Sequence, residues 1–127
     1  AMQGLAVVPI FAGYDANRET GRLFQFDVTG GRYEEQDFAT SGSGSLHAGT
    51  VIKLGFRPEL TTEEALLLAV KALWHAADED SATGGPDPIR GIYPVLSAIT
   101  ADGFRQLTDD ESGEVFSEFR EELTGGE

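Results

Sequence analysis

The sequence predicts an α+β domain, in which runs of strands and runs of helices follow one another along the chain. Segments with strand-like and helix-like patterns occur in the order three strands, two helices, two strands and a helix. Two threonine-led capping signals mark helix starts, and glycine-rich turns separate the strands. The length of 127 residues and the 40% share of hydrophobic residues suffice for one domain with a core of its own.

The first strand is predicted at residues 5–14, where apolar side chains follow one another almost without interruption. Such a run, with β-branched members and no helical period, is typical of a strand buried on both faces. A strand of this kind needs partner strands and covering layers, and the chain enters it almost at once after Ala1. We therefore expect the sequence to be the second half of a larger domain. A complete small domain whose first strand is central is the alternative.

Two further strands are predicted at residues 23–28 and 33–39. Apolar and polar side chains alternate in the first of them, and Thr29-Gly30-Gly31 follows as a turn. The pattern is weaker in the second because acidic side chains interrupt it. A glycine- and serine-rich segment, residues 40–45, then ends this run of strands.

Two helices are predicted next, one at residues 46–54 and one that begins at Thr61. The Arg57-Pro58 pair follows the end of the first. At the start of the second, Thr61 and Glu64 fit a capping box, in which each side chain accepts a hydrogen bond from a backbone amide at the helix start. Its apolar face repeats at helical spacing and consists of Leu66, Val70, Leu73 and Ala77.

A β-hairpin and a last helix are predicted in the remainder of the chain. Residues 91–100 are apolar enough for a buried strand, Ala101-Asp102-Gly103 forms the turn, and residues 104–107 form the return strand. Thr108 and Glu111 fit a second capping box. The apolar face of the helix that follows consists of Val115, Phe116, Phe119 and Leu123.

The charge balance and the residue types exclude several classes of function. With 9 basic against 22 acidic residues, the formal net charge is −13, which repels nucleic-acid phosphates and anionic membrane surfaces. The sequence has no cysteine, which excludes disulfides, thiolate metal ligands and a cysteine nucleophile. It has no run of about 18 apolar residues for a membrane span and no signal-peptide pattern at its start. We expect a cytoplasmic protein that binds neither nucleic acid nor a membrane.

The segment from Ser41 to Ser45 is the first candidate site. Its glycines let the backbone approach a ligand closely, and the helix start that follows offers free amide groups and a positive dipole end. The spacing is not that of a nucleophile elbow, and the lysine of a phosphate-binding P-loop is absent. A tight capped turn without a ligand is the alternative.

The acidic loop after the long helix, residues 78–88, is the second candidate site. It combines three acidic residues, two hydroxyl residues and the rigid Gly84-Gly85-Pro86. An EF-hand does not fit, because Thr83 stands where glycine is required and Ile89 where the bidentate glutamate belongs. A helix end capped by Gly84, with a solvated charge run before it, is the alternative.

The two histidines are weaker candidates for chemistry. Neither His47 nor His75 has a second histidine or a cysteine at the spacing of a metal pair, and His75 with Glu79 is typical of an exposed ion pair. A triad of Ser43, His47 and Asp80 would place its serine and histidine at one helix start, without an identifiable oxyanion device.

Five segments match, in order, those of a known family: Gln3-Gly4-Leu5, Ala12-Gly13-Tyr14-Asp15, Gly42-Ser43-Gly44-Ser45, Ala76 to Asp87, and Arg90-Gly91-Ile92-Tyr93-Pro94. With these segments the sequence resembles proteasome β subunits of the actinobacterial type, over residues 1 to about 107. The Gly-Ser-Gly turn between a strand and a helix, and the Asp-x-x-Thr-Gly-Gly loop after a helix, are the most specific features. The resemblance implies that residues 1–127 are the C-terminal portion of a single β-subunit domain.

The resemblance implies a partial N-terminal-nucleophile hydrolase fold, an α/β/β/α sandwich, and the activity of a threonine-type endopeptidase that degrades proteins inside a closed barrel. The family's nucleophile is an N-terminal threonine released from a propeptide, with its own α-amine as the base. This threonine, and the Asp and Lys that assist it, belong to the family's first half and are absent from this chain. We therefore expect the chain alone to be inactive. No cofactor is implied.

The same resemblance implies that three residues support that threonine. Ser43 and Asp80 correspond to the family's serine and aspartate, which form hydrogen bonds around the threonine amine and hydroxyl. Thr83 stands where a serine is more usual, which retains the hydroxyl and adds a methyl group. In some relatives, main-chain carbonyls that correspond to those of Ala77, Asp80 and Thr83 form a cation site.

The implied partners are those of a proteasome core particle. They are α subunits, other β subunits in a seven-membered ring, a ring ATPase activator that acts through the α ring, and protein substrates. Phe26-Asp27, at the end of the second strand, is implied to reach the substrate channel of a neighbouring subunit. Two alternative functions remain: an acidic module that binds a small ligand or a cation, and a structural ring subunit without catalysis.

Overall fold

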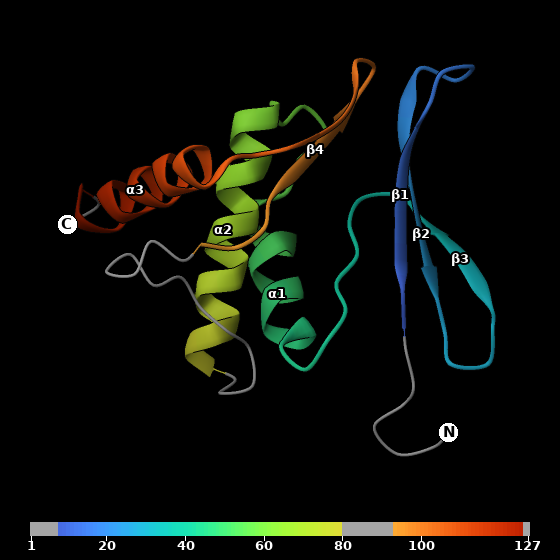
Figure 1. The fold of residues 1–127 in the computed structure, drawn as a ribbon. Helices are drawn as coiled ribbons and strands as arrows, with labels where there is room; N and C mark the ends of the chain where they lie inside the picture. Colours follow the sequence, from blue (N-terminus) through green and yellow to red (C-terminus); the bar gives the residue numbers. More distant parts are fainter. Residues whose placement is uncertain (1–7, 80–92, 126–127) are drawn as a thin grey trace.

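The computed structural model describes residues 8–79 and 93–125 of the chain (Figure 1). Within these residues three strands, two helices, two strands and a helix follow one another, which confirms the predicted α+β class and element order. The elements are β1 Ile10–Asp15, β2 Thr20–Phe26, β3 Arg32–Glu35, α1 Ser45–Gly55, α2 Thr62–Glu79, β4 Ser97–Thr100, β5 Gly103–Gln106 and α3 Asp109–Gly125.

The first three strands form an antiparallel sheet in the order β1-β2-β3. Phe24 in β2 lies opposite Phe11 in β1 and Glu34 in β3, so these three side chains share one face. β3 ends at Glu35, and the prediction that this strand continues to residue 39 is wrong. The Gln25 side-chain amide donates a hydrogen bond to the backbone carbonyl of Thr40 (3.0 Å), and the segment after β3 leaves the sheet toward α1 (Figure 1).

The prediction that the first strand is buried on both faces is wrong for its described part. β1 begins at Ile10, which is 38% exposed, and Phe11 is 61% exposed. β1 pairs with β2 along one edge, and none of the described elements covers the outer face of the sheet at Phe11. A continuous apolar run indicates that a strand has two faces to bury, but it cannot say which chain supplies the covering layer. Residues 5–7 lie outside the described residues.

The second hairpin has the predicted turn but a shorter first strand. β4 spans Ser97–Thr100, and residues 93–96 precede it without regular structure. Within this segment Pro94 has no amide to donate to a strand ladder. Thr100 pairs with Gly103, whose φ of +106° is a conformation that favours glycine. The turn itself therefore consists of Ala101 and Asp102, at the predicted place but one residue shorter than predicted, because Gly103 already belongs to β5.

The helices α1 and α2 form an antiparallel pair, and the predicted capping box at the start of α2 is confirmed. The Glu64 amide donates to the Thr61 hydroxyl (3.1 Å), and the Thr61 amide donates to the Glu64 carboxylate (2.9 Å). Arg57 donates to the same carboxylate at 2.7 Å. The Thr61 amide, followed by Arg57, lowers the pKa of Glu64 below its ordinary value.

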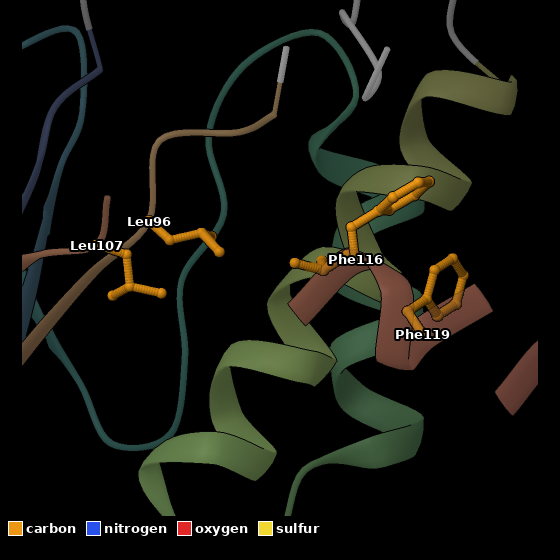
Figure 2. Packing of buried hydrophobic residues seen from close by; sticks show 5 residues of the cluster. Leu96, Leu107, Phe116 and Phe119 are labelled. Carbon is orange, nitrogen blue, oxygen red and sulfur yellow. The ribbon is translucent and has the colours of Figure 1, made fainter. Parts of the chain in front are cut away.

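The main buried core lies between α2, α3 and the β4–β5 hairpin, away from the three-stranded sheet (Figure 2). Two of its residues, Leu96 and Leu107, flank the hairpin, and the Leu107 amide donates to the Leu96 carbonyl at 2.9 Å. Aromatic rings join the two helices, with Trp74 on α2 centred 5.9 Å from Phe116 and 5.8 Å from Phe119 on α3. The core residues are Val70, Leu96, Leu107, Phe116 and Phe119.

The apolar faces predicted for the two long helices are confirmed in their central turns. Val70 on α2 and both Phe116 and Phe119 on α3 are buried. The prediction fails at the end of α3, where Leu123 is exposed. Leu123 is 46% exposed and does not belong to the core cluster.

The capping box at the start of α3 leads to a prediction about stability. The Glu111 amide donates to the Thr108 hydroxyl (3.2 Å), and the Thr108 amide donates to the Glu111 carboxylate (2.8 Å). We expect Thr108→Ala to lower the free energy of unfolding by about 1 kcal/mol, because a first-turn amide loses its acceptor. Thr108→Ser keeps the oxygen and should remain near wild type. Urea denaturation at pH 7 measures both, and equal losses in the two variants would contradict the capping role.

Candidate functional site

The turn that contains Ser43 leads directly into α1. The Ser45 amide donates to the Gly42 carbonyl (3.1 Å), and Gly42 has a φ of +104°, a backbone conformation that side chains disfavour. Gly44 occupies the N-cap position of α1 and supplies no side-chain cap. The predicted turn before a helix is therefore confirmed. Helix amides at such a start can interact with a negatively polarised atom.

Two hydroxyl groups just before Ser43 in the chain hold this turn in place. The Ser41 hydroxyl donates to the Val8 carbonyl at 2.9 Å, and the Thr40 hydroxyl donates to the Ser45 carbonyl at 3.1 Å. The Ser43 side chain is exposed. Sequence patterns did not reveal the structural roles of Thr40 and Ser41, because their acceptors are carbonyls that only the folded chain brings near. The arrangement fixes the backbone on either side of an exposed Ser43.

The other residues predicted for the active site and the cation site lie in the last turns of α2 or after it in the sequence. Ala77 is half-buried in the last turns of α2, and Asp80 and Thr83 lie outside the described residues. Because the two helices are antiparallel, α1 begins at the end of the pair where α2 finishes (Figure 1). The Ser43 turn and the last turn of α2 therefore lie at one end of the helix pair. The cation site predicted at the carbonyls of Ala77, Asp80 and Thr83 stays a prediction.

No metal cluster is formed by the part of the chain that the structure describes. No three side chains among its histidines, aspartates and glutamates come together in a way that could hold an ion. His47 is on α1 and His75 on α2.

A cleft of about 640 Å³ lies beside the Ser43 turn, between the strands β1 and β4 and the helix pair. Its lining is mainly apolar and includes Ile10, Ile52, Leu66, Leu73 and Ile99. Ser41 and Thr40 line its edge, whereas Ser43 does not belong to the lining. The cleft is thus separate from the candidate site, and its side chains have no group suited to acid–base chemistry.

The turn between β2 and β3 is built around the carboxylate of Asp27. One oxygen, Oδ1, accepts hydrogen bonds from the Thr29 amide (3.0 Å), the Thr29 hydroxyl (2.8 Å) and the Gly31 amide (2.7 Å). The other, Oδ2, accepts one from the Tyr33 hydroxyl at 2.9 Å. These donors, the Thr29 hydroxyl first, lower the pKa of Asp27 to about 2. The Asp27 carboxylate is therefore ionised throughout the physiological pH range and is bound within its own turn.

A group of side chains around Arg22 on one face of the three-stranded sheet was not predicted from the sequence. Arg22 donates two hydrogen bonds to the Glu34 carboxylate, each 3.0 Å long, and one to Asp15 at 3.4 Å. Its guanidinium also lies 5.0 Å from the ring centre of Phe24. The hydrogen bond from Arg22 lowers the pKa of Glu34. Strand register brings these residues together, and register could not be read from the sequence alone.

Comparisons with known proteins agree with these motifs. The family model described as "Proteasome subunit" matches residues 1–89, which include the Ser43 turn and the acidic loop. "Proteasome subunit beta" of Streptomyces griseus is 60% identical over 115 residues, and the match covers 91% of this chain and 41% of that relative. The protein of the same name from Acidimicrobium ferrooxidans is 53% identical, with 91% and 42% covered. That of Frankia alni is 50% identical, with 87% and 40% covered.

The chain thus spans about two fifths of the length of the curated relatives it matches. The family model nevertheless covers well over half of the chain itself, including the Gly-Ser-Gly turn that leads into α1. This chain belongs to the proteasome subunit family.

Proposed function

We propose that this chain forms part of a proteasome core β subunit, a threonine-type endopeptidase, and supplies the supporting residues of its active site. The observation that carries the proposal is the 60% identity to a "Proteasome subunit beta" across 91% of the chain. The alternative of an acidic module that binds a small ligand or a cation is not favoured by these comparisons. Of the described residues, those at the Ser43 turn agree best with a supporting role.

The chemistry of the proposal follows from the needs of a threonine nucleophile. An α-amine with a pKa of about 7.7 to 8.0 can take the proton of the hydroxyl at neutral pH, and a nearby carboxylate favours its charged form. In this proposal Asp80 supplies that carboxylate, and the hydroxyls of Ser43 and Thr83 orient the amine and its proton. Orientation needs fixed positions rather than unusual reactivity, and the hydrogen bonds from Thr40 and Ser41 fix the backbone beside Ser43.

The proposed fold of the complete subunit is the four-layer α/β/β/α sandwich. The described residues contain one sheet and one hairpin, and the mainly apolar cleft between β1, β4 and the helix pair is the place where further strands of such a sandwich would fit. Exposed apolar side chains on α1 support the proposal that further parts of the subunit pack against this helix. Leu46 is 77% exposed and Leu54 is 84% exposed.

The proposed partners are α subunits and further β subunits in seven-membered rings, a ring ATPase activator that acts through the α ring, and protein substrates. The proposed compartment is the cytoplasm. The structure contributes a single finding on membranes, namely that none of the described helices is long and apolar enough to cross one.

The proposal predicts a clear difference in peptidase activity. We expect the 127-residue chain alone not to turn over a fluorogenic peptide, because it contains no nucleophile of the proposed type at its first residue, Ala1. A β-subunit chain that includes these residues, expressed with α subunits, should hydrolyse the same peptide. Release of the fluorophore over time measures both. Turnover by the 127-residue chain that disappears in Ser43→Ala would contradict the proposed division of the active site.

A further inference from the structure

The Ser43 turn has a glycine on either side of its serine, so contacts from outside the turn decide where the serine lies. Glycine gives the backbone more conformational freedom than any other residue. Gly44 supplies no side-chain cap to α1, and the Gly42 carbonyl accepts a hydrogen bond from the Ser45 amide at 3.1 Å. These contacts within the turn do not relate it to the sheet. A hydroxyl that orients a reacting group needs a fixed position relative to the rest of its site.

Two hydrogen bonds attach the chain just before the turn to one end of the three-stranded sheet. The Gln25 side-chain amide on β2 donates to the Thr40 carbonyl at 3.0 Å. The Ser41 hydroxyl donates to the Val8 carbonyl, just before β1, at 2.9 Å. Both anchors lie at the same end of the sheet, because the amide of the residue after Gln25 donates to the carbonyl of the residue after Val8 at 3.1 Å. The turn is therefore attached to two neighbouring segments of the sheet.

Gln25 is a polar residue among apolar neighbours. It is half-buried and lies opposite Ile10 in β1 and Tyr33 in β3. Leu23, two residues earlier in β2, is on the same face. A polar side chain in such surroundings costs free energy unless its hydrogen-bonding groups have partners, and the Thr40 carbonyl is a partner of the Gln25 amide. The bond to Thr40 gives a physical reason for a glutamine at this position.

Thr40 connects this anchor with the start of α1. Its carbonyl accepts the hydrogen bond from Gln25, and its hydroxyl donates to the Ser45 carbonyl in the first turn of α1 at 3.1 Å. Ser43 lies between Thr40 and Ser45 in the chain. One residue thus links the turn to the sheet through its backbone and to the helix through its side chain.

We propose that Gln25 and Thr40 are positioning residues that hold the Ser43 hydroxyl at a fixed place relative to the sheet. The inference rests on the proposed function, in which Ser43 orients the amine of the threonine nucleophile. Gln25 and Thr40 act in this role through the Ser43 turn and not through contact with the substrate. Loss of either hydrogen bond should therefore lower kcat and leave the KM for a peptide unchanged.

The first test measures amide hydrogen exchange by NMR in the 127-residue chain. The amides of Ser45 and Ala48 report on the turn, because they donate to carbonyls of its two glycines at 3.1 and 3.0 Å. Gln25→Met and Thr40→Val should each speed exchange at both amides about 3- to 10-fold. Thr40→Ser retains the hydroxyl and should exchange at the wild-type rate.

Three controls separate a local effect from a loss of global stability. The Leu107 amide donates to a carbonyl of the buried core and should exchange at the same rate in all variants. Thr50→Val removes a hydroxyl that donates to another carbonyl of α1 at 2.9 Å, and Gln106→Met replaces an exposed glutamine of β5. Both should leave the two reporting amides unchanged. Wild-type exchange at these amides in both test variants overturns the inference, and so does an equal acceleration at Leu107.

The second test measures peptide hydrolysis by assembled particles of α subunits and a β-subunit chain that includes these residues. Thr40→Val should lower kcat about 3- to 10-fold with KM within about twofold, and Thr40→Ser should restore kcat. In particles that carry Ser43→Ala, the further change Thr40→Val should alter kcat by less than about 1.5-fold, because no hydroxyl remains to be positioned. Thr50→Val particles should hydrolyse the peptide at the wild-type rate.

The double variant decides whether Thr40 acts through Ser43. Equal factors of loss in kcat with and without the Ser43 hydroxyl overturn the inference, since Thr40 then acts by another route. A rise in KM at unchanged kcat overturns it as well. Wild-type particles without turnover, or full kcat in Ser43→Ala particles, contradict the proposed function instead. The exchange rates in the chain then decide whether Gln25 and Thr40 hold the turn.

Discussion

Phe119→Ala is expected to lower the free energy of unfolding of this chain by about 3 to 5 kcal/mol. Phe119 is 1% exposed and belongs to the core cluster between α2, α3 and the β4–β5 hairpin. Its ring lies 5.8 Å from that of Trp74 and 6.3 Å from that of Phe116, so truncation leaves a cavity bordered by two aromatic rings. Domains of this size are stable by about 5 to 15 kcal/mol in total, so the loss is a large share.

Urea denaturation at pH 7, followed by circular dichroism, measures this loss. Trp74 is the single tryptophan of the chain, so its fluorescence gives a second signal from the same core. Phe104→Ala removes the same type of side chain from a position that is 67% exposed, and it should change the free energy of unfolding by less than about 1 kcal/mol. Equal midpoints for the two variants would show that α3 does not depend on Phe119 for its packing.

Asp80→Asn in a β-subunit chain that includes these residues is expected to lower kcat for peptide hydrolysis by at least about 100-fold. The proposed role of the carboxylate is to favour the charged form of the threonine α-amine and to hold it in place, and an amide does neither as well. Propeptide removal should slow as well, because the same threonine performs both reactions. Thr83→Ser restores the residue that is more usual in the family and should have a much smaller effect.

The matched control for this experiment is Asp78→Asn, which removes a carboxylate from the exposed last turn of α2 only two residues away. Rates are measured with a fluorogenic peptide, and propeptide removal is followed by the mass of the subunit. If Asp80→Asn and Asp78→Asn give the same rates as wild type, Asp80 has no part in the mechanism.

Several features of this chain were predictable because they depend on residues close together in sequence. Both capping boxes formed as expected, since the Thr61–Glu64 and Thr108–Glu111 hydrogen bonds need only one turn of helix. The turn at Gly103 and the Gly42 turn before α1 also follow from local backbone preference. Membership of the proteasome subunit family was likewise readable from the motifs, and the family model confirms it.

Features that depend on distant partners required the tertiary structure. The exposure of Phe11 is decided by which chain covers the sheet, and the early end of β3 is accompanied by a hydrogen bond from Gln25 to Thr40. The contact of Arg22 with Glu34 depends on strand register, which composition and period leave open.

The same distinction between local and distant interactions applies to the fold as a whole and to the candidate site. Short-range patterns and motifs specify the α+β class, the element order, the family and the position of Ser43 at a helix start, so these could be predicted from the residues. Only the folded chain shows that the core lies between α2, α3 and the hairpin, and that the Ser43 turn is at the end of the helix pair where α2 finishes. The folded chain also shows that the Asp27 carboxylate accepts hydrogen bonds from the Thr29 and Tyr33 hydroxyls of its own turn. The physical reason is that burial and side-chain hydrogen bonding depend on which surfaces meet in space, and a linear pattern records only that a surface is apolar or polar.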